Sequence, residues 1–348
     1  MKHHTAIAID LAKNSFQVCQ IKNYKPIRNK AYTRAKLIAL LSKHPPCLVV
    51  MEACGSAHFW ARTVEGMGHQ AMIIAPKTVA AFRAGHKTDH NDAEAIAAAL
   101  LHPGLKTVSP KTVEQQGLQS IERIREHLQD QRTATSNLIR SLVFEFGMTI
   151  PRGLKALRET LPLILEDAEN ELPMALRHEL AELWHEYQLL TTRFTELEAR
   201  RDQLIKQHHI CEKLMKLEGV GPVNALNLYL SLGNNGGNFA NGREAAACIG
   251  LTPKQHSTGG KVVLGKIGKL SGNRRLRANL VQGARAVLKE VQRRGPANNK
   301  EAWIKALIER RGFGKASVAL ANKTVRTAWA MLHNSEDYRG PQPLAACC

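Results

Sequence analysis

The stretch AIAIDLAKNSFQVCQIK (residues 6–22) decides the fold of the N-terminal part of this chain. Apolar residues alternate with other residues on both sides of the short segment LAKNS, which predicts a β-hairpin over residues 5–22. Residues 30–33 predict a third strand. An acidic residue, Asp10, stands where the first arm gives way to the turn. A lone Asp at a strand end is usually a turn or cap residue, so its meaning depends on its neighbours in the fold.

The next hundred residues predict strands that alternate with helices. Helices are predicted over residues 34–43, 57–68 and 87–101, and buried strands over residues 47–53 and 69–76. The first buried strand, CLVVMEA, ends at Glu52, and the last helix opens with the polar segment KTDHND. Alternation of this kind is typical of an α/β layer.

The composition of the chain favours a polyanionic partner. Lys and Arg number 49 against 30 Asp and Glu in 348 residues, a formal net charge of +19. Such an excess is natural for a nucleic-acid-binding protein, although a merely soluble basic protein stays open as an alternative. We expect no membrane partner, because no apolar run approaches the length of a membrane span and the first residues do not form a signal peptide. Seven cysteines without a CxxC pair predict reduced thiols and a cytoplasmic protein. With a DNA partner, we expect the protein to be associated with the bacterial nucleoid.

The middle of the chain predicts long helices. Charged residues interleave with Leu and Ile at three- and four-residue spacing over residues 113–146 and 154–211, which predicts two or three helices in an antiparallel hairpin or coiled coil. We interpret this region as a scaffold or dimer contact. The segment EGVGP that follows has the layout of a helix-hairpin-helix, in which backbone N–H groups approach a DNA phosphate, although a plain helix turn explains it nearly as well.

The positive charge is concentrated in the C-terminal part. Residues 251–326 contain 18 Lys and Arg residues against three acids, and aromatic residues are few there. This balance favours contact with a phosphate backbone over base stacking. The candidate nucleic-acid-binding residues are Lys254, Lys261, Lys266, Lys269, Arg274, Arg275 and Arg277.

Four acids stand at the ends of predicted elements: Asp10, Glu52, Asp89 and Asp92. Each has an ordinary explanation, since Asp89 and Asp92 also favour a helix N-terminus. Glu52 is less ordinary, because a carboxylate at the end of a buried strand needs a partner or a metal. Taken together, in the order strand, strand, helix, the four fit an RNase H-like (RuvC-like) arrangement. Four oxygen ligands of this kind suit two Mg²⁺ ions, with Mn²⁺ as the alternative metal, which clamp a phosphodiester.

The segment HSTGGK presents Ser257 before two glycines and a Lys-rich loop. Neighbouring cations would stabilise the transition state of phosphoryl transfer and activate a nucleophile. A phosphate-binding loop without a covalent role explains the same residue types at least as well. Ser271, in KLSGNRR, is interpreted as the N-cap of the basic helix that follows.

In chain order, these motifs resemble those of the DEDD transposases of bacterial insertion sequences, recombinases that are guided by a bridge RNA. The motifs are AIDLAKNSF, MEACGS, KTDHNDAEAIA, LEGVGP and GLTPKQHSTGGK…LGKIGKLSGNRRLR, and the resemblance spans residues 4–330. It implies that Asp10, Glu52, Asp89 and Asp92 bind Mg²⁺, and that Ser257 attacks DNA to form a 5′-phosphoserine intermediate. It also implies a noncoding guide RNA and dimers that assemble into tetramers on double-stranded DNA. Gly268 stands where relatives often have Ser, which leaves the loop geometry and a phosphate contact by Ser271 open.

The predicted organisation has four parts: a RuvC-like α/β domain (residues 1–110), a helical coiled-coil insert (111–212), a basic, mainly α transposase domain with the serine loop (213–333) and a disordered tail (334–348). The alternatives are a metal-dependent junction resolvase or nuclease that hydrolyses DNA, and a nucleic-acid-binding protein without chemistry. An actin-like ATPase is disfavoured by the lack of a second phosphate loop and of a Gly-rich adenosine site. A tyrosine recombinase is disfavoured because the five tyrosines lack a matching Arg/His set.

Overall fold

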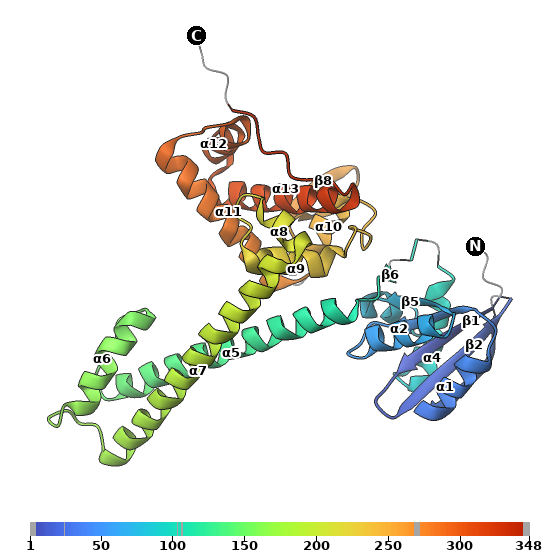
Figure 1. Cartoon of the computed structure of the whole chain (residues 1–348), viewed down its shortest axis with the longest axis horizontal. Coiled ribbons are helices and arrows are strands. Elements are labelled where there is room, and N and C mark those ends of the chain that lie inside the picture. The colour runs from blue at the N-terminus through green and yellow to red at the C-terminus, as the bar shows by residue number, and fades with distance from the viewer. Residues whose placement is uncertain (1–4, 24, 103, 106, 268–271, 344–348) are drawn as a thin grey trace, which may run out of the picture. The chain divides into compact units, whose positions relative to one another are not determined.

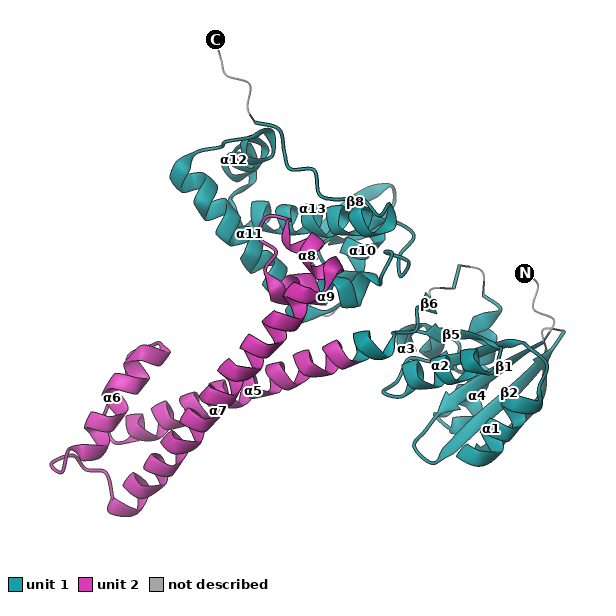
Figure 2. Ribbon diagram, viewed as in Figure 1, with its two compact units in different colours: residues 1–116, 227–348 teal, residues 117–226 magenta. Residues whose placement is uncertain are grey.

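A computed structural model describes residues 5–23, 25–102, 104–105, 107–267 and 272–343 (Figure 1). The chain divides into two compact units, residues 1–116 together with 227–348, and residues 117–226 (Figure 2). Within the described part of the chain, we find no helix with both the length and the apolar character needed to cross a membrane.

The N-terminal region folds around a six-stranded mixed sheet, in the order β3-β2-β1-β4-β5-β6. The strands are β1 (Thr5–Leu11), β2 (Ser15–Lys22), β3 (Lys25–Thr33), β4 (Leu48–Glu52), β5 (Gln70–Ile74) and β6 (Thr107–Val108). Strands β1, β2 and β3 form an antiparallel meander, and β4 and β5 run parallel to β1. This order and these directions are consistent with an RNase H-like domain. The predicted hairpin is confirmed, and the third strand is longer than expected.

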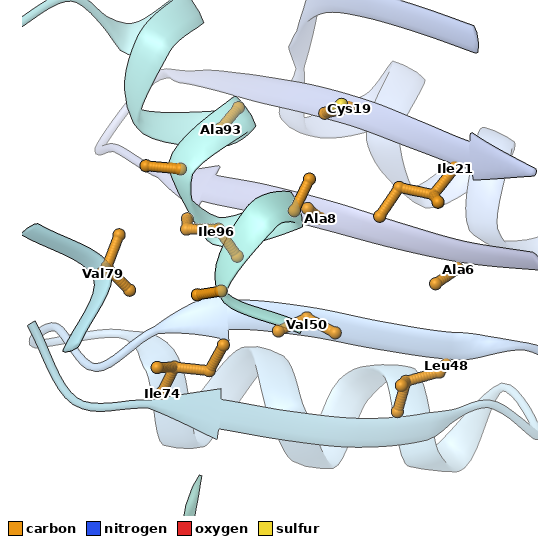
Figure 3. Close-up of a cluster of buried hydrophobic side chains, with 13 residues drawn as sticks. Ala6, Ala8, Cys19, Ile21, Leu48, Val50, Ile74, Val79, Ala93 and Ile96 are labelled. Carbon is orange, nitrogen blue, oxygen red and sulfur yellow. The ribbon is translucent and has the colours of Figure 1, made fainter. Parts of the chain in front are cut away.

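Period-two alternation divides the sheet into two apolar faces. Ile7, Ile9 and their neighbours pack against α1 (Arg34–Lys43) and α2 (Ala57–Gly66). Ala6 and Ala8 face α4 (Asp89–Leu100), which lies across the other side of the sheet (Figure 3). Alanines on both the strands and the helix leave little side-chain volume between them, so the backbone of α4 lies close to the sheet. Two short elements, α3 (Pro76–Ala80) and β6, were not predicted from the sequence.

The second unit is built on long antiparallel helices. Its elements are α5 (Val113–Glu145), which begins in the first unit, α6 (Leu154–Glu166), α7 (Met174–Gln207) and α8 (His209–Met215). Glu122 contacts Arg201, whereas Arg132, further along α5, donates a hydrogen bond to Thr191, which is earlier on α7. The contact positions advance along α5 while they go back along α7, so the two helices are antiparallel, and the predicted antiparallel hairpin is confirmed. Coiled-coil packing of this insert stays a prediction.

A buried charge network joins α5 to α7. The Arg201 side chain is 2% exposed and its Nη1 lies 3.6 Å from Oε2 of Glu122, which is 5% exposed. Removing one partner of a buried pair leaves the other charge uncompensated. We therefore expect Glu122→Ala to lower the stability of this unit by about 2–4 kcal/mol. This loss is smaller than for an isolated buried ion pair, because Glu198 and Asp202 also contact Arg201 and keep part of its charge compensated.

Chemical denaturation followed by circular dichroism measures this loss. The matched control is Glu159→Ala, which removes an exposed carboxylate paired with Lys155 on α6 and is expected to change stability by less than about 1 kcal/mol. Equal effects of the two substitutions would show that the Glu122 network does not support the helix pair.

The C-terminal region is mainly helical, with one small antiparallel sheet. Its elements are α9 (Pro222–Leu232), which begins in the second unit, α10 (Gly242–Ile249), β7 (Pro253–Thr258), β8 (Lys261–Ile267), α11 (Arg274–Arg294), α12 (Asn299–Arg311) and α13 (Phe313–His333). Helix α10 approaches α13 so closely that a Cβ atom at Gly242 would lie 3.0 Å from the Cα atom of Arg326. Helices α8 and α9 flank the EGVGP segment as predicted, and a DNA-binding role for it stays a prediction.

The expectation of a disordered tail does not hold for residues 334–343. The backbone of Pro343 forms a bridge with Asn298, and Nζ of Lys300 donates a hydrogen bond of 3.1 Å to the hydroxyl of Tyr338. Lys300 also lies over the Tyr338 ring. An aromatic residue and a backbone bridge therefore fasten this segment to α12, whose first residue is Asn299.

Candidate active site

Two of the predicted acids are neighbours because β1 and β4 are parallel. Ile9 pairs with Met51, and one residue further along each strand lie Asp10 and Glu52. Both acids continue the period-two series that faces α4, after Ala8 on β1 and Val50 on β4. The parallel register thus places two half-buried carboxylates at the same end of the sheet, on the face covered by α4.

The other two acids are carried by the first turn of α4. Thr88 is the N-cap of this helix, and its side chain accepts a hydrogen bond from the backbone N–H of Asn91. Asp89 and Asp92 follow in the first turn, where three-residue spacing puts them on one side of the helix. Asp92 is buried and Asp89 is exposed. The structure therefore brings all four acids to the same end of the sheet.

The pKa values of Asp10 and Glu52 reflect the charges around them. Burial raises the pKa of Asp10 above its ordinary value, and the charges of Asp92 and Asp89 raise it further. Burial likewise raises the pKa of Glu52, with additional contributions from Asp10 and Asp92. Arg83 and Lys87 oppose both shifts. Burial and like charges both disfavour the ionised carboxylates, and a nearby positive charge favours them.

Arg83 is a residue of this site that sequence reasoning missed. Its guanidinium Nε forms an ion pair and hydrogen bond with Oδ1 of Asp92. Arg83 follows α3, an element that no sequence signal predicted, so nothing in the sequence pointed to this contact. Its positive charge lies beside the four acids and offsets part of the repulsion among their carboxylates.

The donor set suits a divalent metal chemically. Carboxylate oxygens are the hard ligands that Mg²⁺ prefers, and Mg²⁺ is usually held by one or two carboxylates together with substrate phosphate and water. Among the described residues, no three acidic, His or Cys side chains already form a coordination shell. One oxygen of Asp92, Oδ1, already accepts a hydrogen bond from Arg83.

The raised pKa values predict how stability depends on pH. An acid whose pKa is higher in the folded protein than in the unfolded chain costs stability once it ionises, and this cost develops as the pH rises from the unfolded pKa through the folded pKa. We therefore expect Asp10→Asn to raise the Tm of the metal-free protein by a few degrees at neutral pH. The gain should shrink as the pH falls towards the ordinary pKa of Asp, 3.8.

Asp92→Asn is the contrasting variant. It removes the partner of Arg83, whose side chain is 23% exposed, and is expected to lower stability by about 1–3 kcal/mol. Thermal unfolding in a chelator between pH 4 and pH 8 measures both effects. A fall in Tm for Asp10→Asn as large as that for Asp92→Asn would contradict this description of the cluster.

Ser257 lies on a different sheet, the hairpin of β7 and β8. The serine pairs with Val262, and Gly259 and Gly260 between them adopt positive φ angles of 55° and 77°, as a type I′ turn requires. The expectation of a serine loop is thus corrected: β-branched Val262 and Val263 favour a strand, and the two glycines confine the turn to two residues. Ser257 is exposed, as predicted.

The predicted nucleic-acid-binding residues fall into three groups. Lys254, Lys261 and Lys266 are exposed on the hairpin, and Arg274 and Arg275 are exposed on the first turn of α11. Lys269 lies outside the described residues. Arg277 differs from the expectation, because it is 8% exposed and donates a hydrogen bond of 3.3 Å to the carbonyl of Ile249. Its guanidinium joins α11 to the end of α10.

The N-cap of α11 is Asn273, whose side chain accepts a hydrogen bond of 3.0 Å from the backbone N–H of Leu276. This corrects the assignment of the cap to Ser271, which lies outside the described residues together with Gly268. Asn is as good a helix cap as Ser, and it is adjacent to the first helical residue.

Comparison with known proteins yields two family models and several relatives. A model described as a transposase, whose label names the DEDD and IS110 types, matches residues 3–147, and a model described as transposase IS116/IS110/IS902 family matches residues 211–298. The transposase for insertion sequence element IS1111A of Coxiella burnetii is 39% identical over 97% of this chain and 92% of its own length. A probable family 20 transposase of Pseudomonas aeruginosa is 38% identical over 96% and 98% of the two chains. The transposase for insertion sequence element IS1328 of Yersinia enterocolitica is 34% identical over 95% and 97%.

Proposed function

The chain belongs to the IS110 family of insertion-sequence transposases, and we propose that it cuts and rejoins DNA through Ser257, with a divalent metal held by the four acids and a noncoding RNA as guide. The observation that carries this proposal is the convergence of Asp10 and Glu52, from adjacent parallel strands, with the acidic first turn of α4. Asp and Glu side chains concentrated at one end of a mixed sheet are suited to phosphodiester chemistry.

In the proposed reaction, the Oγ atom of Ser257 attacks the scissile phosphorus. A P–Oγ bond forms and the bond from phosphorus to the 3′ oxygen breaks; the serine loses its proton and the departing 3′ oxygen gains one. The product is a 5′-phosphoserine and a free 3′-hydroxyl. Attack of another strand's 3′-hydroxyl on this phosphoserine rejoins the DNA and restores the serine, so no phosphodiester bond energy is lost to water.

The acids would hold the metal, which when bound polarises the scissile phosphate and neutralises charge in the transition state. Asp10 and Glu52 supply ligands from strand ends, which are more rigid than loops. Asp89 and Asp92 would supply ligands from the first turn of α4, where Asp92 is also paired with Arg83. The proposed metal is Mg²⁺, as two ions, with Mn²⁺ as a substitute.

We assign the proposed roles to the parts predicted from the sequence. Residues 1–110 form the RuvC-like metal-binding domain, residues 111–212 the coiled-coil insert and residues 213–333 the transposase domain that presents Ser257. The exposed cations of the hairpin and of α11, Lys254, Lys261, Lys266, Arg274 and Arg275, are proposed to contact double-stranded DNA, with Lys269 as a further candidate. Dimers are proposed to assemble into tetramers on the DNA.

A strand-exchange assay tests this function. The protein is incubated with a junction that carries the element ends, a target duplex, the noncoding RNA that flanks the element, and Mg²⁺. We expect recombinant DNA only when all components are present, and a protein–DNA adduct on a denaturing gel. Cut DNA with no adduct and no rejoined product would establish the second candidate, a hydrolytic nuclease that shares the acid cluster.

A further inference from the structure

A second candidate site lies in the C-terminal region, apart from the acids and from Ser257. A groove of about 1740 Å³ is lined by residues of the α9–α10 connection, α10, the β7–β8 hairpin, α12 and α13. Binding sites for drug-sized ligands usually enclose about 300–1,000 Å³. The size of this groove therefore suits a segment of a polymer better than a metabolite.

Six cationic side chains surround the groove, and no Asp or Glu is among its described lining residues. They are Arg243, Lys266, Arg311, Lys315, Lys323 and Arg326. All six are exposed, and none forms an ion pair with a carboxylate among the described residues. By contrast, Arg293 and Arg294 on α11 are both paired, with Glu290 and Glu301. Unpaired cations of one sign around a hollow attract a polyanion.

The cations of α13 follow one side of that helix. The groove is lined on α13 by Lys315, Ala319, Lys323 and Arg326, which follow one another at steps of four, four and three residues. From Lys315 to Arg326, the first and last of these cations, the helix rises about 16 Å. The positive charges are therefore spread along the helix, which suits the successive phosphates of a nucleic-acid backbone. They are not clustered around one position, as a site for a single phosphate group would be.

The surface between the cations is mostly apolar. It includes Leu264 and Ile267 of the hairpin, Val318 of α13 and the indole of Trp303 from α12. Nζ of Lys323 lies over the Trp303 ring, 4.6 Å from its centre, so a cation stands against one face of the aromatic ring. A duplex offers its phosphates to a protein and keeps its bases stacked inside, whereas a single strand offers bases for aromatic and apolar contact.

We propose that this groove binds a single-stranded segment of RNA, with phosphates on the cations of α10, α12 and α13 and a base against the indole of Trp303. The groove itself argues for a single strand; the choice of RNA rests on the proposed function, in which the DNA enters as duplex and the RNA supplies unpaired segments. The site differs from the predicted contact residues, with which it shares Lys266 alone.

Binding of a fluorescent, unstructured RNA oligonucleotide by the full chain, measured by anisotropy at several salt concentrations, tests the proposal. For a single strand, log Kd changes with log salt by about 0.7 per phosphate contact. The double variant Lys315→Gln/Arg326→Gln should weaken binding and lower this slope by about 1.4. Arg293→Gln is the matched control, because it removes an exposed but paired cation, and its slope should not change.

Trp303 tests the base contact separately from the charges. Trp303→Ala should weaken binding about 5- to 100-fold without changing the salt slope, and Trp303→Tyr should restore most of the affinity. Circular dichroism and Tm identify any variant that fails to fold, and Tyr retains a large ring for packing. An equal loss with Arg293→Gln, or an unchanged slope in the double variant, would overturn the proposal.

Competing nucleic acids test the identity of the ligand. A DNA oligonucleotide of the same sequence, or a duplex, that competes better than RNA and depends on the same residues would overturn the assignment to single-stranded RNA. Glu52→Gln and Ser257→Ala should bind the RNA as wild type does. If the groove variants bind RNA as tightly as the wild type and strand exchange is intact, this inference alone is rejected. If no adduct forms and Ser257→Ala still cuts DNA, the proposed function is rejected.

Discussion

Replacing Ser257 by Ala is expected to abolish both the covalent protein–DNA adduct and strand exchange. Removal of a nucleophile that forms a covalent intermediate typically costs about 10⁴-fold or more in rate, because the remaining groups act only through it. Ser257 is exposed on a two-residue-turn hairpin, so loss of one hydroxyl there should leave the fold intact. Trapping on a denaturing gel with junction DNA, RNA and Mg²⁺ measures the adduct.

The control for this variant is the neighbouring hydroxyl of Thr258, the last residue of β7. Thr258→Val keeps the shape and the strand propensity of the side chain and is expected to retain adduct formation. Ser271→Ala tests whether that residue supplies a phosphate contact, with a weaker adduct as the expected result. If Ser257→Ala still cuts DNA at the wild-type rate, the serine chemistry is wrong and hydrolysis by a metal-activated water takes its place.

Neutralising Glu52 is expected to produce the second largest loss. Glu52→Gln keeps the size of the side chain but removes a charge from the group that would hold Mg²⁺, so DNA cleavage should fall about 10²- to 10³-fold or more. Mg²⁺ should also raise the Tm of the wild-type protein, because a ligand that binds only the folded state stabilises that state. At a Mg²⁺ concentration 100 times the Kd, the free energy of unfolding rises by about 2.7 kcal/mol. In Glu52→Gln this increase should largely disappear.

A matched control for the charge change is Glu94, which lies on α4 beyond the acidic first turn. Its side chain is 46% exposed and faces His90 at 3.2 Å. Glu94→Gln should retain both the Mg²⁺-dependent rise in Tm and the cleavage activity. If Mg²⁺ stabilises Glu52→Gln as much as the wild type, the carboxylate of Glu52 is not a metal ligand and its role must be sought in folding or DNA contact.

Local patterns determined the elements of the N-terminal domain and the residue types of its site. Alternating apolar residues identified β1 and β2, and short apolar runs identified β4 and β5, because both patterns are direct consequences of strands that bury one or both faces. The same patterns identified Asp10 and Glu52, since a charged residue at the end of an apolar run interrupts it visibly. The helical periodicity of α5 and α7 likewise predicted the antiparallel pair that Glu122 and Arg201 connect.

Only the tertiary structure decided which of these residues meet. The parallel register of β1 and β4 sets Asp10 beside Glu52, and the packing of α4 on alanines of the sheet brings Asp92 to them; the ion pair of Asp92 with Arg83 depends on a turn that has no sequence pattern. The groove around Trp303 gathers cations from α10, β8, α12 and α13. That Arg326 lines the groove while Arg277 is buried depends on long-range packing, which a local pattern of residue types does not encode.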